Sequence, residues 1–454
     1  MALFPVVFLF EAIISSFVVN KEINPYASDI STFFCFVNIV VVLILILNNK
    51  SCKEDEDLKK YILISYFIRI AILFWDIYMQ NVFVLPNAEG DAIFYAQKAA
   101  SYAFGGRQGI VNYNDFPYYV SLLYRIMGVQ KMNVQFLHIY YAICSILLVN
   151  KILKMLDVND YTRKNAIKFM CFLPNALMIT TFFLYESLLS FLVVLSLYCY
   201  TVWWKQNKKF YFVSAILLSG CAGMLHMGGI ALGLALIVSY PIIKYQDRLP
   251  RFNLLTIIGV AAMAVVGIAL VLYFGDSFLG KIGGEIDADN IQRRASLYEG
   301  GGSVYSSNIS SASGIAGFLI NTPVRFLALI FAPFPWRWRN LSDVLAFFGS
   351  SLFFIYVWMQ IVSYPKIKKQ VSSLNIETKN NYGFIIVLII VLIIVGIMFG
   401  WGVSNAGSAL RHREKYCGVY IVILALINNL KYKLKHIEMQ EFLCQRPNKR
   451  KKFR

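Results

Sequence analysis

Apolar runs of about twenty residues recur along nearly the whole chain, separated by short polar segments. The run from Gly383 to Gly400 contains no charged residue. Because about 20 apolar residues are needed to cross the hydrocarbon core of a bilayer, such runs predict membrane-spanning segments. Their backbone must satisfy its own hydrogen bonds in lipid, which favours helices. The sequence lacks the alternating segments, each about 10 residues long, that are typical of outer-membrane barrels.

The pattern predicts about twelve membrane-spanning helices in an all-α integral membrane protein. They are expected at residues 2–19, 30–47, 61–84, 134–153, 168–184, 187–204, 210–226, 228–243, 253–274, 341–363, 383–401 and 417–430. The first run lacks a basic region before it and contains Glu11, so we interpret it as a helix and not as a signal peptide.

Basic residues gather in every second loop, and this spacing predicts the orientation of the chain. The basic segments are 50–60, 151–168, 205–209, 244–251, 366–379 and the tail 431–454. Short loops rich in Lys and Arg stay in the cytoplasm, so both termini are expected there. The remaining segments, 85–132, 275–340 and 402–416, are then extracytoplasmic loops. Two of them hold apolar stretches, 116–129 and 314–335, which predict short interfacial or re-entrant helices.

Composition agrees with a single polytopic membrane domain over residues 1–454. Hydrophobic residues make up 58% of the chain and charged residues 15%, against about 25% charged residues in soluble domains. The net charge of +18 is explained by the cytoplasmic loops, so we expect no nucleic-acid partner. The eight cysteines show no paired or metal-ligand spacing, and no metal site is predicted.

The strongest candidate site residues are basic residues on the side expected to be outside. The densest cluster is Arg411, His412 and Arg413, followed by Glu414 and Lys415. Arginine forks bind phosphate oxygens bidentately, so this cluster is a candidate site for a lipid-linked phosphate. The alternative is that these side chains only reach the headgroups or that the topology differs here.

Carboxylates form the second group of candidates. Glu89 and Asp91 flank Gly90 at the outer end of the third span, where one carboxylate can serve as a general base. A purely structural role at a helix N-terminus is the alternative. Glu186 lies alone between two apolar runs, where a carboxylate is either solvated in a turn or functional at membrane depth.

Arg293 and Arg294 precede a run of three glycines in the second large outer loop. Backbone N–H groups of such a loop can approach an anion, although a flexible loop is an equal alternative. All of these candidates fall on the same outer side under a topology derived only from loop charge.

Short motifs resemble those of known membrane enzymes. Glu89-Gly90-Asp91, followed by Tyr95 and Ala99, resembles the first outer-loop acidic motif of GT-C-type glycosyltransferases. The stretch 172–175 with Glu186 resembles a helix pair of the same superfamily. Segments 332–336 and 405–413 look like those of bacterial membrane proteins encoded with surface-polysaccharide genes, which are glycosyltransferases or O-antigen or capsule polymerases. The pair is Glu-Gly-Asp here, whereas Asp-containing dyads are commoner in the family.

The resemblance implies an enzyme that transfers glycosyl groups from a polyprenyl-phosphate or pyrophosphate carrier. It would act in the cytoplasmic (inner) membrane of a bacterium, with the active site facing the periplasm or exterior, in assembly of lipopolysaccharide or capsule. Arg411, His412 and Arg413 would bind phosphate with Arg293 or Arg294, Glu186 would line the substrate site, and Asp91 or Glu89 would act as the base.

Two alternatives stay open within that function and one outside it. Single-sugar transfer and repeat-unit polymerisation both fit, and the external arginines favour the polymerase. A non-catalytic transporter or flippase of lipid-linked glycans is the rival. We expect no organic cofactor, and a divalent cation held by the acidic pair stays an alternative. The expected partners are the lipid-linked donor, the glycan acceptor, the bilayer and other polysaccharide-assembly proteins.

Overall fold

The computed structural model describes residues 1–18, 29–105, 115–226, 228–244, 314–373, 379–403 and 405–444. Across these residues the chain is helical and contains no strand. The helices of the first half are α1 (Phe4–Val18), α2 (Asp29–Leu47), α3 (Lys50–Glu54), α4 (Glu56–Tyr78), α5 (Asp91–Phe104), α6 (Phe116–Met127), α7 (Lys131–Met155), α8 (Asp160–Phe172), α9 (Pro174–Ile179), α10 (Glu186–Gln206), α11 (Lys209–Leu225) and α12 (Gly228–Lys244).

The second half contributes fewer described helices, several of which are interrupted. They are α15 (Gly314–Phe331), the 3-10 turn η1 (Pro335–Arg337), α16 (Leu341–Ala346), the π-helical turn η2 (Phe347–Ser351), α17 (Leu352–Ser373), α18 (Lys379–Trp401), α19 (Ala406–Glu414) and α20 (Cys417–Cys444). Helices α16, η2 and α17 follow one another without a break, so they form one long apolar segment.

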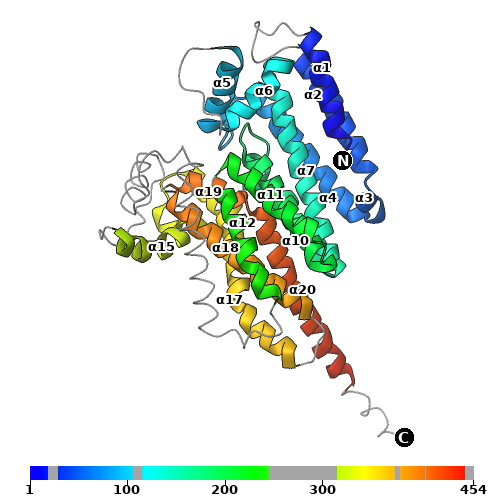
Figure 1. Ribbon diagram of the computed structural model, residues 1–454, viewed down its shortest axis with the longest axis vertical. Coiled ribbons are helices and arrows are strands. Elements are labelled where there is room, and N and C mark those ends of the chain that lie inside the picture. Colours follow the sequence, from blue (N-terminus) through cyan, green and yellow to red (C-terminus); the bar gives the residue numbers. More distant parts are fainter. Residues whose placement is uncertain are drawn as a thin grey trace.

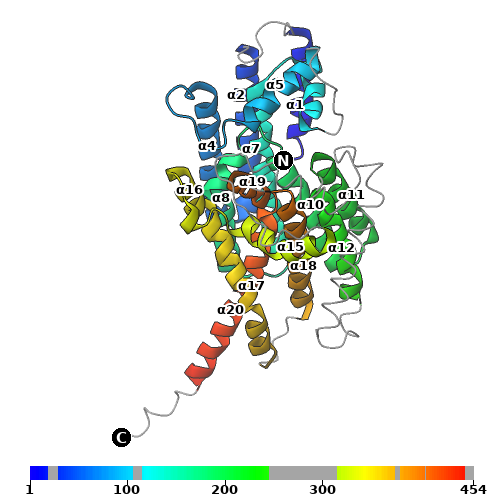
Figure 2. The ribbon, with the colours of Figure 1, turned by 90° about the vertical axis from the view of Figure 1, so that its left-hand side faces the viewer.

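Six helical segments in the described part of the chain are long and apolar enough to cross a membrane (Figures 1 and 2). They cover Glu56–Tyr78, Lys131–Met155, Glu186–Gln206, Leu341–Val371, Tyr382–Trp401 and Cys417–Gln440. Shorter apolar helices accompany them at Phe4–Phe17, Ser31–Leu47, Lys209–Leu225, Gly228–Pro241 and Ile320–Phe331. These helices are consistent with a multi-pass membrane protein.

Most of the predicted spans coincide with helices, but the span predicted at 168–184 does not form one helix. It divides into α8, which ends at Phe172, and α9, which runs from Pro174 to Ile179. Proline disfavours helical backbone at the residue before it, and Leu173 accordingly adopts an extended conformation with ψ 116°. The resulting corner lets Pro174–Ile179 turn toward the segment that precedes Glu186.

The last helix is longer than the sequence pattern predicts. Apolar residues thin out after Leu430, where three lysines alternate with other residues, but α20 continues to Cys444. Lysine is a good helix former, so the end of the apolar run is not the end of the helix. The predicted span 253–274 lies outside the described residues. The predicted interfacial stretches correspond to α6 and α15, and α5 precedes α6 in the same outer segment.

Ion pairs gather several basic loops at one end of the helices. Lys154, near the end of α7, lies 3.2 Å from Glu54 of α3, and Lys205, near the end of α10, lies 2.9 Å from Asp157. We call this the basic end. The opposite ends of α7 and α10 begin at Lys131 and Glu186, and we call that the site end. Helices α7 and α10 therefore run in the same direction, from the site end to the basic end (Figure 1).

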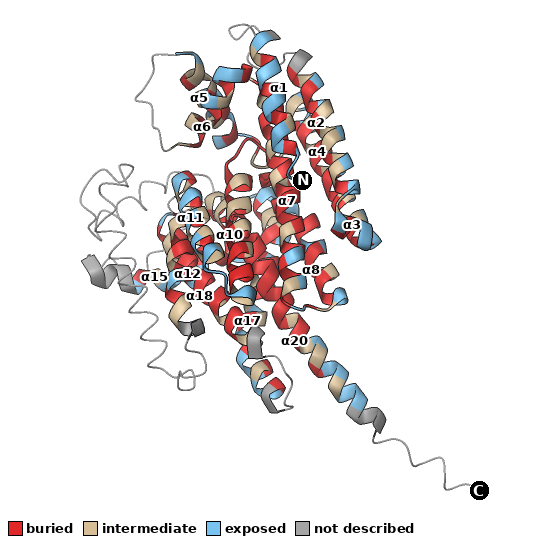
Figure 3. Ribbon diagram, turned by 45° about the vertical axis from the view of Figure 1, so that its right-hand side comes forward, coloured by how far each residue is buried: buried red, intermediate tan, exposed pale blue. Residues whose placement is uncertain are grey.

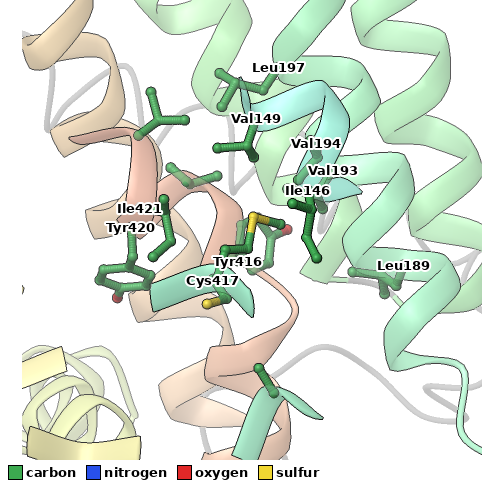
Figure 4. Close-up of a cluster of buried hydrophobic side chains, with 14 of the residues drawn as sticks. Ile146, Val149, Leu189, Val193, Val194, Leu197, Tyr416, Cys417, Tyr420 and Ile421 are labelled. Carbon is green, nitrogen blue, oxygen red and sulfur yellow. The ribbon is translucent and has the colours of Figure 1, made fainter. Parts of the chain in front are cut away.

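The core is deepest where α7, α10 and α20 meet (Figure 3). Aliphatic side chains of α7 and α10 pack there against Tyr416, Cys417, Tyr420 and Ile421 (Figure 4). Gly418 makes the contact between helices close, because a Cβ at that position would lie 2.4 Å from Val194. This packing fixes the beginning of α20, and with it the residues of α19 directly before it, against the beginning of α10.

Two charged residues of α4 take separate partners. Arg69, with 2% exposure, donates to the Thr180 hydroxyl at 3.3 Å. Asp76 accepts from Gln80 at 2.8 Å and from Gln135 at 2.7 Å. They share one face of α4, as a spacing of two turns predicts, and each of them ties α4 to a different neighbour.

Candidate functional site

Glu186 lies at the site end, as the first residue of α10. Its position suits a carboxylate, because the N-terminus of a helix carries a partial positive charge. The side chain is nevertheless 99% buried, with 1% exposure, which requires compensation of its charge. One carboxylate oxygen, Oε1, has that compensation, whereas Oε2 has no hydrogen-bond partner among the described residues.

Arg411 supplies the positive charge. Its Nε donates to Glu186 Oε1 at 2.8 Å and its Nη2 lies 2.7 Å from the same oxygen. The guanidinium is held on α19, whose first turn is capped by Asn405, which accepts from the Ser408 N–H at 2.8 Å. Burial alone would lower the pKa of Arg411, but the neighbouring carboxylates, Glu186 foremost, outweigh it and raise that pKa.

Asp91 completes a carboxylate–arginine–carboxylate group, because Arg411 Nη1 donates to its Oδ2. Asp91 is the first residue of α5, and Gly90 before it has φ +61° and ψ −113°, a conformation that glycine adopts most readily. The Asp91 side chain is 53% exposed, in contrast to Glu186. We call Asp91, Glu186 and Arg411 the bridge cluster.

The bridge cluster joins segments that are far apart in sequence. Asp91 and Arg411 are separated by 320 positions, and Glu186 and Arg411 by 225. Asp91 and Glu186, which were predicted from separate parts of the sequence, thus both contact Arg411 of the basic segment 411–413. The Asp91 carboxylate is exposed and accessible to a ligand, whereas the Glu186 carboxylate is buried.

Lys415 lies beneath the bridge cluster and is fully buried. Its ammonium donates to the Tyr185 hydroxyl at 3.0 Å, contacts His412 Nδ1 at 3.0 Å and lies 3.8 Å from Glu186. Burial lowers the pKa of Lys415 to about 7, and repulsion from Arg411 opposes the attraction of Glu186. The charge of this amine therefore changes near neutral pH.

An aromatic wall surrounds Lys415 and His412. The His226 ring stacks on Phe399 at 5.0 Å between centroids and meets the His412 ring edge-on at 4.8 Å. Burial, followed by the charge of Lys415, lowers the pKa of His412 well below its ordinary value. A neutral His412 imidazole can accept from the Lys415 ammonium, which explains their contact.

Arg413 points away from the bridge cluster. Its Nη1 donates to the backbone carbonyls of Ile330 at 2.5 Å and Ala332 at 2.8 Å, and its Nη2 to the Ser351 hydroxyl at 3.2 Å. Glu414 accepts from Asn175 at 2.9 Å. Both side chains therefore fasten α19 to the end of α15, to η2 and to α9.

The periodicity of α19 explains this division of roles. Positions 411 and 415 are one helical turn apart and share a face, whereas 413 and 414 face the packing side. Of the other predicted site residues, Glu89 is exposed beside the cluster and makes no ion pair within the described ranges. Arg293 and Arg294 lie outside the described residues.

Sequence reasoning did not single out Tyr185, and it named Tyr95 only as part of the acidic motif. The two rings lie beside the cluster with centroids 6.0 Å apart. The signal available for Tyr185 was its place next to Glu186. The described residues contain no group of three or more His, Cys, Asp or Glu side chains placed to hold a metal ion. The bridge cluster offers instead one arginine for an anion, with the buried Lys415 next to it, and one exposed carboxylate for a proton.

Comparisons of the chain with protein-family models, with curated proteins and with solved structures find no match.

Proposed function

We propose that this protein is a glycosyltransferase of the GT-C type, acting on a polyprenyl-phosphate or pyrophosphate donor at the outer face of a bacterial cytoplasmic membrane. The observation that carries the proposal is the bridge cluster, in which Arg411 joins the exposed Asp91 to the buried Glu186. A base, a phosphate-binding cation and a group that orients this cation are the parts that glycosyl transfer from a good leaving group requires.

The proposed orientation places the basic end in the cytoplasm and the site end outside. Its twelve spans have both termini inside, and the cluster lies where a lipid-linked phosphate meets the headgroup level. Contacts such as those of Lys154 and Lys205 support it, because they gather lysine-rich loops at the end opposite to Arg411.

Donor binding begins with exchange of an anion at Arg411. The donor phosphate replaces the exposed carboxylate of Asp91 on Nη1, while Glu186 keeps its two contacts to Nε and Nη2 and holds the guanidinium plane in place. An arginine is suited to this exchange because its fork can bind two anions at once. Lys415 adds positive charge behind it.

The released Asp91 carboxylate then acts as the general base. The acceptor hydroxyl oxygen bonds to the anomeric carbon as the bond from that carbon to the phosphate oxygen breaks. The hydroxyl proton goes to Asp91, and the bonding electron pair leaves with the phosphate. Arg411 stabilises the charge that grows on the leaving phosphate, which is worth most in a water-poor site.

The remaining predicted residues take supporting roles in this proposal. His412 lines the site through its contact with Lys415, and Arg413 positions α19 because its guanidinium is occupied by backbone carbonyls. Glu89 is the alternative base, and Arg293 or Arg294 assist with the phosphate. Repeat-unit polymerisation is favoured over transfer of a single sugar, because the arginines expected on the outer side would suit the two diphosphate-bearing substrates of a polymerase.

Deletion of the gene in the producing bacterium tests the proposal. The lipid-linked glycan pool, labelled metabolically with tritiated N-acetylglucosamine and galactose, is separated by chromatography. We expect the unextended lipid-linked glycan to accumulate and the extended product to disappear, with restoration by wild-type protein. If the same glycan accumulates on the cytoplasmic leaflet, inaccessible to an external glycosidase, the transporter alternative holds and the transferase proposal fails.

A further inference from the structure

A groove opens near the basic end of the protein. It lies between α8, α17 and α20 and has a volume of about 240 Å³. This is smaller than the 300–1,000 Å³ typical of pockets that enclose a whole small molecule. The groove belongs neither to the bridge cluster nor to the aromatic wall around Lys415.

The groove changes in character along its length. At one end it is lined by Lys431 and Lys435, one turn apart on α20, together with Tyr161 and Tyr432. At the other end it is lined by Phe169 and Leu424. From position 424 to 435 an α-helix rises about 16 Å. The cationic, aromatic mouth and the apolar floor together are therefore longer than one headgroup layer of roughly 5–8 Å, and they can hold a headgroup and the beginning of an acyl chain.

The lysines retain donors for a ligand. Lys431 donates one N–H to Gln360, which leaves two of its three ammonium protons. Lys435 is exposed and makes no ion pair within the described ranges. The rings of Tyr161 and Tyr432 lie 6.2 Å apart beside them. Tyrosine is the residue type that favours the headgroup level of a membrane.

The apolar end continues onto a surface made for acyl chains. One face of the segment from η2 to α17 exposes apolar side chains at helical spacing, with Tyr356 in the groove wall. The exposed residues are Phe348 at 61%, Leu352 at 40%, Tyr356 at 40%, Met359 at 64% and Val362 at 76%. An apolar stripe of this size is unfavourable in water and favourable against lipid.

We propose that this groove binds one anionic phospholipid, with its phosphate on Lys431 and Lys435 and an acyl chain along Phe169 and the α17 stripe. Charge complementarity selects the occupant, because both charged lining residues are cations and the floor is apolar. The groove lies toward the end that gathers the lysine-rich loops, and such an end faces the leaflet rich in anionic lipid. The proposal is independent of glycosyl transfer.

Native mass spectrometry of the full-length protein in a neutral detergent tests this site. The probes are palmitoyl-oleoyl phosphatidylglycerol and phosphatidylcholine with the same chains, added at equal concentrations. We expect one phosphatidylglycerol molecule to be retained in preference to phosphatidylcholine. Lys435→Gln should weaken that retention about fivefold, and Lys431→Gln/Lys435→Gln about tenfold to thirtyfold, as expected for lysines near an anionic headgroup.

The matched control is Lys208→Gln/Lys209→Gln, which removes the same charge from exposed residues at the basic end, outside the groove. It should retain phosphatidylglycerol as the wild type does. Glycerol 3-phosphate, which has the headgroup chemistry without acyl chains, should not compete. Equal loss in both double variants, equal retention of phosphatidylcholine, or full competition by glycerol 3-phosphate would overturn the proposal.

Discussion

Arg411 and Glu186 lie 225 positions apart in the sequence, and Arg411 reaches a single oxygen of Glu186 through two of its nitrogens, at 2.8 and 2.7 Å. This contact leaves Nη1 for the exposed carboxylate of Asp91. The buried carboxylate thus orients the guanidinium, and the exposed carboxylate occupies the position that a ligand anion would take.

Glu186→Gln tests the orienting role. The amide keeps the shape but loses the charge, so Arg411 exchanges a charge-assisted contact for a weaker one. We expect the free energy of unfolding to fall by about 1.5–3 kcal/mol and transfer to fall at least tenfold. Thermal unfolding in detergent and product formation per membrane-inserted protein are measured. Glu438→Gln is the matched control, because the exposed Glu438 makes no ion pair within the described ranges, and it should be nearly silent in both measurements.

Arg411 and Arg413 should differ in transfer per folded protein. Arg411→Ala removes the phosphate-binding cation, so transfer per folded protein should fall about a hundredfold, and stability should also fall because the buried Glu186 loses its charge partner. Arg413→Ala removes a donor from the Ile330 carbonyl and leaves the Ala332 carbonyl with the Ser351 hydroxyl, so about 1–3 kcal/mol of stability should be lost. Unchanged transfer in folded Arg411→Ala would remove Arg411 from the mechanism.

Arg411→Lys tests whether the site needs the geometry of arginine or only its charge. Arg411→Lys keeps the charge but cannot bind Glu186 and a phosphate together through a planar fork, so we expect only partial activity. Full activity in this variant would mean that the site needs a positive charge and not the arginine geometry.

The sequence predicted helices well where one property dominates. The uncharged run 383–400 became part of α18 because length and hydropathy decide such a helix alone. The prediction was wrong at Pro174, where the restricted backbone before a proline divides an apolar run into two helices. It was also wrong after Leu430, where residues that favour helix continue α20 beyond the end of the apolar run.

The candidate site shows a similar limit. Loop charge alone predicted that Asp91, Glu186 and Arg411 share one side, because that follows from counting spans. Their pairing depends on how α5, α10 and α19 pack, and no periodicity in the sequence encodes contacts between positions 225 and 320 residues apart. The inward direction of Arg413 was within reach of helical periodicity, since it lies off the face shared by 411 and 415.

Lys415 should make stability depend on pH. Its pKa in the folded protein is about 7, below the ordinary value of 10.5, with burial as the main cause. Between these values the unfolded chain binds more protons, so the free energy of unfolding should rise as pH increases from 7 toward 10. Below pH 7 the lysine is charged in both states, so the gain in stability from its deprotonation is absent.

Thermal unfolding of wild type and Lys415→Met between pH 6.5 and about 9.5 measures this effect. Lys415→Met should remove much of the rise with pH, because methionine is buried without a proton. Parallel curves for the two proteins would show that Lys415 does not titrate in this range.

Orientation is tested by impermeant thiol labelling in a cysteine-free background. Lys50→Cys and Lys208→Cys lie at the basic end, and Glu89→Cys lies beside the bridge cluster. In intact cells only Glu89→Cys should react, whereas all three should react after the membrane is opened. Labelling of Lys50→Cys and Lys208→Cys in intact cells would reverse the proposed orientation.

Asp91→Asn tests the proposed chemistry most directly. Asparagine keeps the shape of the side chain and is tolerated at the start of a helix, but it cannot accept the acceptor proton. In proteoliposomes, tritium-labelled lipid-linked glycan from the producing bacterium is supplied, and extended product is measured per folded protein for wild type and Asp91→Asn. We predict a fall of about two to four orders of magnitude with unchanged thermal stability, whereas near-normal turnover by Asp91→Asn would contradict the account.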